Sequence, residues 1–142
     1  MRLRALTVRQ PYAWAIAEAG KSVENRSRPL QYRGPLAIHA GLSVDRDAYR
    51  AAPIMAASAA FQQRMGRPPV LATGAVIAVV DLVGCHGDSR CCLPWGQPWQ
   101  HHLELANVRL LRSPVPARGQ MGLWFLDDEA TAAVRRQVPV PL

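Results

Sequence analysis

The sequence contains a single lysine, Lys21, although Lys and Arg together make up 17 residues. A lysine amine that is partly removed from water and close to other cations loses its proton readily, and it then acts as a base or a nucleophile. Arg26, Arg28 and Arg33 follow Lys21 and supply such cations. Arginine does not replace lysine in this chemistry because its guanidinium stays protonated. Lys21 is therefore a candidate catalytic residue, with an exposed cation at a strand edge as the alternative.

Glu24 lies three residues after Lys21. A carboxylate at this position is suited to activate water as a general base, or to accept a hydrogen bond from Lys21 or from the amine of a cytosine. A salt bridge to Arg26 or Arg33 is the alternative interpretation. In a regular strand, Lys21 and Glu24 would point to opposite faces. Both side chains reach one cleft only if the chain is still turning out of Gly20 when it arrives at Lys21.

Three residues between a predicted strand and a predicted helix are candidates for phosphate binding. Backbone amides at the start of the helix, after Gln10 and Pro11, would hold the phosphate, with Arg9 beside them. A plain strand-to-helix connection with a solvated arginine is the alternative. His39 lies on the strand face opposite Leu36, where it either lines a cleft or serves as a structural histidine.

The segment 85–100 is rich in Gly, Pro, Cys and Trp and is predicted to be a loop. Its aromatic residues Trp95 and Trp99 either stack on nucleic-acid bases or plug the open end of a small barrel. Potential zinc ligands also gather here: Cys85, His86, Cys91, Cys92, His101 and His102. No C-x-x-C pair occurs, and adjacent cysteines serve one tetrahedral site poorly. The sequence therefore predicts neither a metal site nor a cofactor.

Composition excludes several classes of protein. The chain has 142 residues, of which 49% are hydrophobic, so it is not intrinsically disordered, and its length predicts one domain over residues 1–142. No apolar run reaches the roughly 18–20 residues that a membrane-spanning helix needs, and the N-terminus does not resemble a signal peptide. The net charge of +7 favours a polyanionic partner such as RNA, single-stranded nucleic acid or a nucleotide, although a coding bias toward Arg and Ala would also produce it. Three cysteines are a poor disulfide framework and predict a cytoplasmic location.

The pattern of apolar residues predicts an α+β fold. Predicted strands cover 3–8, 22–26, 36–40, 74–84, 101–111 and 119–126, and predicted helices cover 11–20, 43–65 with a break at Pro53, and a short segment from Asp127. Residues 138–142 are predicted to be a flexible tail. Five to six strands with short helices between them favour a small β-barrel with flanking α-helices.

Several segments resemble the ASCH domain family, in which a G-x-K-x-x-E-x-R-like segment is the hallmark. The corresponding segment here is Gly20-Lys21-Ser22-Val23-Glu24-Asn25-Arg26, which is one residue tighter at the glycine. Residues 6–14, 32–40 and 114–124 are also similar to the family. The resemblance implies a PUA-like β-barrel with a cleft that binds RNA or a nucleotide. Some members hydrolyse the acetyl amide of N4-acetylcytidine, and ribonuclease activity is known for others.

The amidohydrolase members use a Lys, a Thr and a Glu. Lys21 matches the Lys, but Glu24 stands where those members have the Thr, and the third residue has no match in the sequence. We therefore expect a basic cleft that binds RNA or a modified nucleoside, with Lys21 and Glu24 hydrolysing N4-acetylcytidine in the enzymatic version. A non-catalytic RNA-binding module and a metal-independent ribonuclease that uses Lys21 and His39 are the alternatives. The expected ligand-binding residues are Arg9, Gln10, Pro11, Arg26, Arg33, His39, Trp95 and Arg118.

Overall fold

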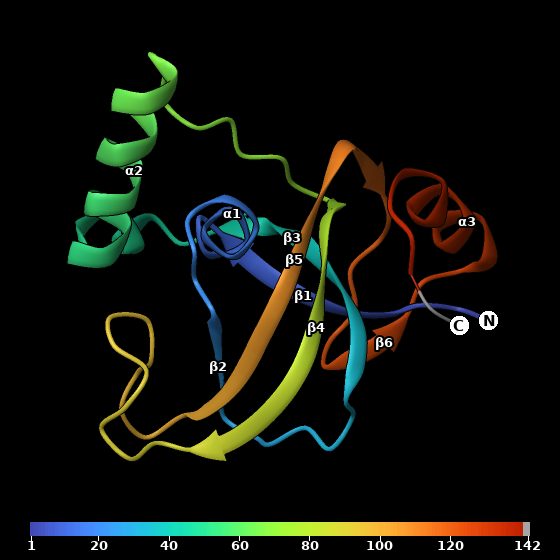
Figure 1. The fold of residues 1–142 in the computed structure, drawn as a ribbon, viewed down its shortest axis with the longest axis horizontal. Coiled ribbons are helices and arrows are strands. Elements are labelled where there is room, and N and C mark those ends of the chain that lie inside the picture. The colour runs from blue at the N-terminus through green and yellow to red at the C-terminus, as the bar shows by residue number, and fades with distance from the viewer. Residues whose placement is uncertain (141–142) are drawn as a thin grey trace.

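The computed structural model describes residues 1–140. Within this range the chain forms six strands, three α-helices and one 3-10 helix, arranged as Figure 1 shows. In chain order they are β1 (Arg4–Gln10), α1 (Tyr12–Glu18), β2 (Val23–Arg26), β3 (Gly34–Val44), η1 (Arg46–Arg50), α2 (Ala52–Met65), β4 (Ala75–Gly87), β5 (His101–Pro116), β6 (Leu123–Phe125) and α3 (Asp128–Gln137). None of the helices in residues 1–140 is long and apolar enough to cross a membrane.

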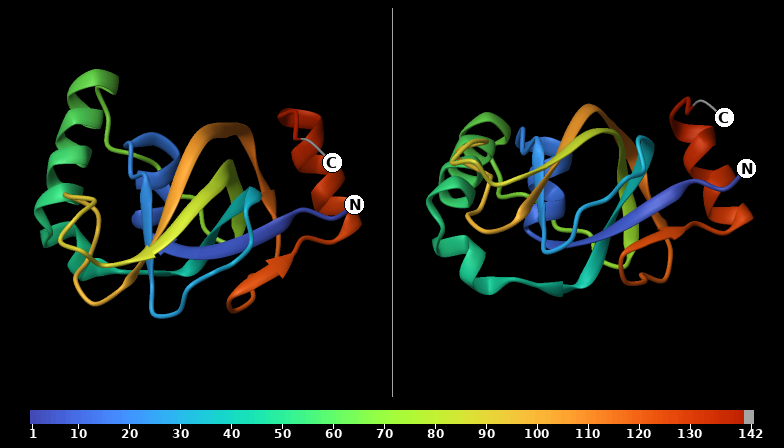
Figure 2. Two further views of the ribbon diagram at one scale, coloured as in Figure 1. Left: turned by 60° about the horizontal axis from the view of Figure 1, so that its bottom comes forward. Right: turned by 90° about the horizontal axis from the view of Figure 1, so that it is seen from below.

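The strands form one sheet in the order β2-β5-β4-β3-β1-β6. β1 and β3 run parallel, whereas the other neighbours are antiparallel. The apolar run Ala75–Val80 makes β4 a central strand that is buried on both faces, as its composition predicts. The ladder between β4 and β5 shifts register in three places, and such irregularities bend strands. Figure 2 shows that β4 and β5 are strongly bent along their length.

The α+β class and the number of strands are confirmed, but the predicted barrel is not formed, because the sheet is open. The end strands β2 and β6 contain four and three residues, too few to complete a closing ladder. β6 pairs only with Arg4–Leu6 of β1, so within residues 1–140 the Thr7–Gln10 edge has a strand partner on one side only. We call the opening between Thr7–Gln10 and β2 the seam.

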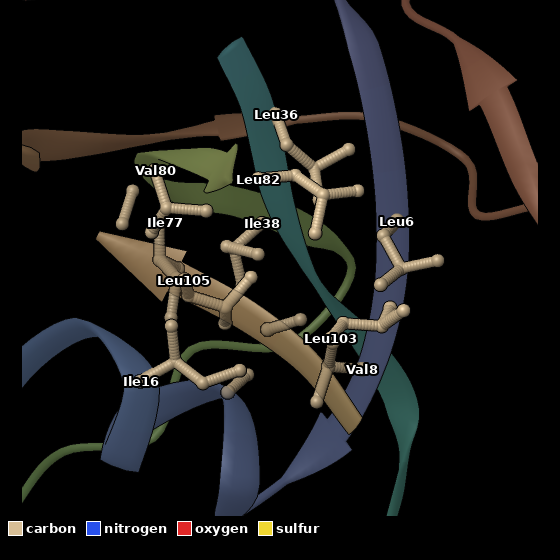
Figure 3. Packing of buried hydrophobic residues seen from close by; sticks show 13 residues of the cluster. Leu6, Val8, Ile16, Leu36, Ile38, Ile77, Val80, Leu82, Leu103 and Leu105 are labelled. Carbon is tan, nitrogen blue, oxygen red and sulfur yellow. The ribbon is translucent and has the colours of Figure 1, made fainter. Parts of the chain in front are cut away.

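Helix α1 is held from two sides, and this fixes the chain that follows it. Ile16 belongs to the main apolar core, and Figure 3 shows it projecting from α1 toward the side chains of the sheet. Trp14 packs in a second cluster with Phe61 of α2, with the two ring centroids 5.7 Å apart in an edge-on arrangement. The segment 19–22, which leads from α1 into β2, therefore starts from a rigid element.

The ends of several elements differ from the predicted ones. Ser43, the expected helix cap, lies inside β3, and Asp45 caps η1 instead by accepting a hydrogen bond from the Ala48 amide. α2 begins at Ala52 with Pro53 in its first turn, where proline is tolerated. The expected flexible tail begins at Val138, which packs against the core near α3. The last part of that tail, 141–142, lies outside the described residues.

Candidate functional site

The turn between α1 and β2 brings Lys21 and Glu24 to the same side. Gly20 has φ +74°, a left-handed conformation that suits glycine, and the Lys21 amide donates to the carbonyl of Ala15 in α1. Lys21 therefore precedes the regular part of β2, and the alternation of a strand does not apply between it and Glu24. Both side chains line one cleft in the seam.

Lys21 is buried, with only 2% of its surface exposed. Its Nζ donates to the Val23 carbonyl and to Glu24 Oε1, and the latter distance is 3.2 Å. It also lies 5.6 Å from the centre of the Tyr12 ring. Burial lowers the pKa of Lys21, and nearby Arg26 lowers it further, although Glu24 opposes both. The buried amine therefore gives up its proton more easily than a lysine in water.

Glu24 connects Lys21 to Arg26. While Oε1 accepts from Lys21, Oε2 lies 3.1 Å from the Arg26 guanidinium. Arg26 also donates from Nη2 to the Thr7 carbonyl over 2.6 Å. A side chain of β2 thus bonds to the edge of β1 that has no strand partner. Lys21, Glu24 and Arg26 form an ion triad that lies across the seam.

The cleft in the seam has a volume of about 370 Å³. Its lining combines cations and anions with side chains that can hydrogen-bond to a base: Thr7, Val8, Arg9, Tyr12, Lys21, Glu24, Asn25, Arg26, Ser27, Asp45, Gln97 and Gln100. Three cations face two anions here, so the lining carries a modest positive charge. A space of this size matches the lower range of small-molecule sites.

His39 and Arg118 lie at a different hollow, of about 510 Å³, which is lined by residues of β1, β3 and the segment 117–121. The Nε2 of His39 lies 2.7 Å from the Ala117 carbonyl, and its Nδ1 lies 3.2 Å from the Thr7 hydroxyl. Burial lowers the pKa of His39, although the hydrogen bond to Ala117 opposes this. Both ring nitrogens are therefore engaged in the packing of β1 and β3, which is the structural interpretation of this histidine. Arg9 and Thr7 line both hollows.

Gln10 and Pro11 are buried and hold the start of α1. The Gln10 Oε1 accepts from the Trp14 amide over 2.8 Å, while its Nε2 donates to the Ala72 carbonyl over 2.8 Å. A buried glutamine side chain thus takes up an amide at the helix start that was expected to bind phosphate. Of the three residues in this connection, only Arg9 is exposed and lines the cleft.

A pair of substitutions separates these roles. We expect Gln10→Leu to lower the free energy of unfolding by about 1–3 kcal/mol, because it leaves the Trp14 amide and the Ala72 carbonyl without partners. We expect it to leave RNA affinity unchanged. Arg9→Met should do the reverse, with weaker RNA binding and unchanged stability. Urea denaturation and fluorescence anisotropy with a labelled RNA measure the two quantities, and weaker RNA binding by folded Gln10→Leu would contradict the structural role.

Two other expected binding residues lie away from the cleft lining. Arg33 is exposed and donates to the carbonyls of Leu30 and Tyr32 in its own loop. Trp95 is half-buried and packs against the cluster of α1 and α2, which agrees with a plug and not with a stacking surface. Trp99, by contrast, is 93% exposed.

Sequence reasoning did not select several residues of the cleft. Tyr12 and Asn25 lie within segments that resemble the family, but their residue types alone do not indicate a site. Gln97 and Gln100 reach the cleft because the loop 88–100 folds back on β2: Asn25 Nδ2 donates to the Trp95 carbonyl and Asn25 Oδ1 accepts from the Gln97 amide. These hydrogen bonds join residues about seventy positions apart, and no local sequence pattern predicts them.

Four side chains that can bind a metal lie close together in this loop and in the strands that flank it. His86, Cys91, Cys92 and His102 each offer an atom, and the four atoms lie within 4.8 Å of one another. Cys85 is a free cysteine outside this group. The fold thus assembles ligands whose spacing in the sequence argues against a shared site.

Comparison with known proteins agrees with this architecture. The chain is similar to the crystal structure of ASCH from Zymomonas mobilis, with a TM-score of 0.57 and 18% identity over 94% of this chain and 93% of that chain. A single-residue mutant of the Zymomonas mobilis protein gives a TM-score of 0.54 and 14% identity over 96% and 98% of the two chains. No curated protein matches the sequence. The sequence profile of the ASCH domain matches residues 6–118. Because this match covers most of the chain, the protein belongs to the ASCH domain family.

Proposed function

We propose that the cleft in the seam binds the base of an RNA nucleotide or modified nucleoside, and that Lys21 and Glu24 hydrolyse the acetyl amide of N4-acetylcytidine there. The observation that carries this proposal is the buried Lys21 amine, which contacts Glu24 in a cleft open to a ligand. Membership of the ASCH family, which is generally associated with RNA binding, supports the class of ligand.

The contacts of Lys21 can also be kept by the neutral amine, which is the form that acts as a base. A neutral amine has two N–H groups and one lone pair, and the two acceptors found among the described residues are the Val23 carbonyl and Glu24 Oε1. The lone pair is then left for a water molecule or substrate in the cleft. Glu24 keeps the amine oriented, while its other oxygen is held by Arg26. Lys21 is therefore the proposed base. Glu24 lines the same cleft and holds the Lys21 amine in place.

The proposed reaction balances with water as the only co-reactant. Lys21 removes a proton from water, and the resulting hydroxide adds to the acetyl carbonyl carbon. The oxyanion that develops is close to the Arg26 guanidinium and the polar lining of the cleft. The C–N4 bond then breaks, and the Lys21 ammonium returns its proton to N4. The products are cytidine and acetic acid, which ionises to acetate by giving its proton to water, and Lys21 is again neutral.

Recognition of the base falls to the amide side chains of the cleft. Gln97 and Gln100 line it from the loop 88–100, opposite Arg9 and Thr7 of β1. An amide offers both a donor and an acceptor, which suits the Watson–Crick edge of a cytosine. Arg9, exposed at the rim, is placed to contact a phosphate.

Release of acetate from N4-acetylcytidine tests the proposal directly. The free nucleoside and a short RNA that contains one acetylated cytidine are incubated with wild-type protein and with Glu24→Gln. We expect turnover by wild type and loss of turnover by the variant. Arg136→Met removes one cation from the exposed end of α3 and is the control for charge. Absence of turnover by wild type with both substrates would refute the hydrolase.

A non-catalytic RNA-binding module is the second candidate, because both oxygens of Glu24 are already held by cations. The same pairing favours the ammonium form of Lys21, which has no lone pair to act as a base but can still bind an anionic ligand. The ribonuclease alternative is less favoured by the geometry, since His39 is buried with both ring nitrogens engaged. If the protein binds RNA in millimolar salt but releases no acetate, the non-catalytic RNA-binding module is the correct function.

Trp99 provides a test of binding that is independent of hydrolysis. It is 93% exposed and lies between Gln97 and Gln100, which line the cleft. If its indole stacks on a base beside the cleft, Trp99→Ala should weaken binding of single-stranded RNA by about 1–3 kcal/mol. Leu93→Ala, an exposed apolar residue of the same loop, is the matched control and should have no effect. Equal affinities for all three proteins in an anisotropy titration would show that Trp99 does not stack.

A further inference from the structure

Two histidine and two cysteine side chains, which are common zinc ligands, lie close together where β4 connects to β5. His86 lies near the end of β4, His102 lies near the start of β5, and Cys91 and Cys92 come from the connecting loop 88–100. The strand ladder sets the two histidines side by side, because His86 pairs with His102 in the register of β4 and β5. The histidine positions are therefore fixed by the sheet, and only the cysteines depend on the loop.

The distances suit a tetrahedral ion. Bond lengths of about 2.3 Å to sulfur and about 2.0–2.1 Å to nitrogen place a sulfur and a nitrogen of one tetrahedral zinc site about 3.6 Å apart. Cys91 Sγ lies 3.6 Å from His102 Nδ1, and Cys92 Sγ lies 3.6 Å from His86 Nε2. The two sulfurs are 3.2 Å apart. Small movements of the two thiol groups therefore complete the arrangement.

Hydrogen bonds of the rings leave the required nitrogens free. His102 Nε2 lies 2.8 Å from the Gln97 carbonyl, so this nitrogen carries the proton and Nδ1 keeps its lone pair toward Cys91. His86 Nδ1 lies 2.7 Å from the Gly87 carbonyl, and the tautomer with its proton on Nδ1 would turn the lone pair of Nε2 toward Cys92. Metal-ligating histidines usually donate their other N–H to a carbonyl or carboxylate in this way.

Negative charge adjoins the same atoms. Glu104 Oε1 lies 3.1 Å from His86 Nε2, the nitrogen that would bind the metal. Without a metal, a proton on this nitrogen can donate to the carboxylate, and a bound cation would take the place of that proton. Asp88 adds a second carboxylate, 3.9 Å from His102 Nε2. These groups favour a cation in the middle of the cluster.

The loop is wound tightly around the cluster. Cys92 has φ +64° and Arg90 has φ +59°, a left-handed conformation that is rare for residues other than glycine. Gly96 leaves no room for a side chain, since a Cβ would lie 2.8 Å from Cys92 Cβ and 2.8 Å from His102 Cε1. The left-handed turn at Cys92 accompanies the close approach of the two adjacent sulfurs, which an extended backbone would direct to opposite sides.

We propose that His86, Cys91, Cys92 and His102 bind one Zn²⁺ ion as a closed structural site. Four protein ligands complete a tetrahedron and leave no position for substrate, which is typical of structural zinc. The site would hold the loop 88–100 against β2, because His102 bonds to Gln97, and Gln97 in turn bonds to Asn25 of the cleft. Zinc would thereby order the wall of the cleft without taking part in any reaction there.

Metal content and cobalt spectroscopy test the site on the whole chain. We expect protein purified without chelator to contain one Zn²⁺ per chain, and Co²⁺ added to chelator-treated protein to give the intense visible bands of tetrahedral thiolate coordination. Cys91→Ser and His102→Gln should weaken Zn²⁺ binding by more than about 100-fold, since even loss of an outer hydrogen-bond partner costs 10- to 100-fold. Cys85→Ser and His101→Gln are the matched controls, because they make the same changes at neighbouring residues outside the cluster. Both variants should still bind one Zn²⁺ per chain.

A thiol count keeps the proposal testable if a ligand variant fails to fold. In folded wild-type protein, zinc should protect two of the three cysteines from alkylation, and a chelator should release both. Less than one Zn²⁺ per chain after reconstitution, or equal affinity in Cys91→Ser and Cys85→Ser, would overturn the site. A Cys91–Cys92 disulfide in protein purified under reducing conditions would overturn it as well. These outcomes do not depend on hydrolysis in the cleft, so either proposal can fail without the other.

Discussion

Lys21→Arg is expected to reduce the rate of acetate release from N4-acetylcytidine by about 10²- to 10⁴-fold, the usual contribution of a general base. The variant keeps a cation at the same place, and so it keeps the attraction to Glu24. What it loses is the ability to give up a proton, since a guanidinium stays charged at any pH that the protein survives. Acetate release under single-turnover conditions measures the chemical step without product release.

The pH profile distinguishes a proton-transfer role from a positioning role. Burial lowers the pKa of Lys21 below that of a free lysine. The active form is the neutral amine, so kcat/KM of wild type should rise with pH and level off above that lowered pKa. The residual activity of Lys21→Arg should lack this rise. Full activity of Lys21→Arg, with a folded spectrum and unchanged RNA affinity, would show that Lys21 is not the base.

Glu24→Gln is expected to lower the free energy of unfolding by about 3–5 kcal/mol at neutral pH. Glu24 is buried between Lys21 and Arg26, and the substitution keeps its size but removes its charge. Two cations then lie close together in a poorly solvated place without a counter-ion. Denaturation by urea, with the slope compared between variants, measures the loss.

The sign of the pH dependence follows from Lys21. Its pKa in the folded protein is lower than in the unfolded chain, so between the two values the unfolded chain binds more protons, and stability rises with pH. Below the folded pKa the full cost of burying the ammonium remains. Removal of Glu24 lowers the folded pKa further, because Glu24 raises it in the wild type. The deficit of Glu24→Gln relative to wild type should therefore shrink as pH rises from neutral toward the value of free lysine.

A double substitution controls for effects unrelated to charge. Lys21→Met with Glu24→Gln removes the unpaired ammonium together with the carboxylate, leaving Arg26, which is partly exposed and still bonds to the Thr7 carbonyl. We expect it to recover most of the stability lost by Glu24→Gln, because replacing both members of a buried pair is often neutral. If the double variant is as unstable as Glu24→Gln, the loss comes from packing and not from an uncompensated cation.

The local features of the site were predictable from the sequence. The single lysine marked Lys21, and the segment 20–26 marked Glu24 as its neighbour. A turn at Gly20 was the condition under which both side chains reach one cleft, and glycine readily takes up the φ of +74° found there. This placement depends on residues close together in the chain, whereas the catalytic roles of Lys21 and Glu24 stay predictions.

Features that depend on distant contacts were not predictable. The open sheet goes with the shortness of β2 and β6, and the ends of these strands depend on pairing with distant partners in β5 and β1 and not on the residue pattern alone. Gln10 looks the same in sequence whether it binds a ligand or caps a helix, and only its contact with Ala72 decides. The cluster of His86 and His102 arises from the register of two strands, whereas its spacing in the chain indicated no metal site.

The bond from Arg26 to the Thr7 carbonyl has a consequence for solubility. An unpaired strand edge, such as Thr7–Gln10 presents, is a template on which another chain can add a strand and start an aggregate. A charged side chain that occupies the edge is one of the means by which proteins prevent this. Arg26 fills that role while it also holds Glu24. The cleft therefore stays open to small ligands and single bases. Arg26, which lines the cleft, opposes the addition of a strand from a second chain at this edge.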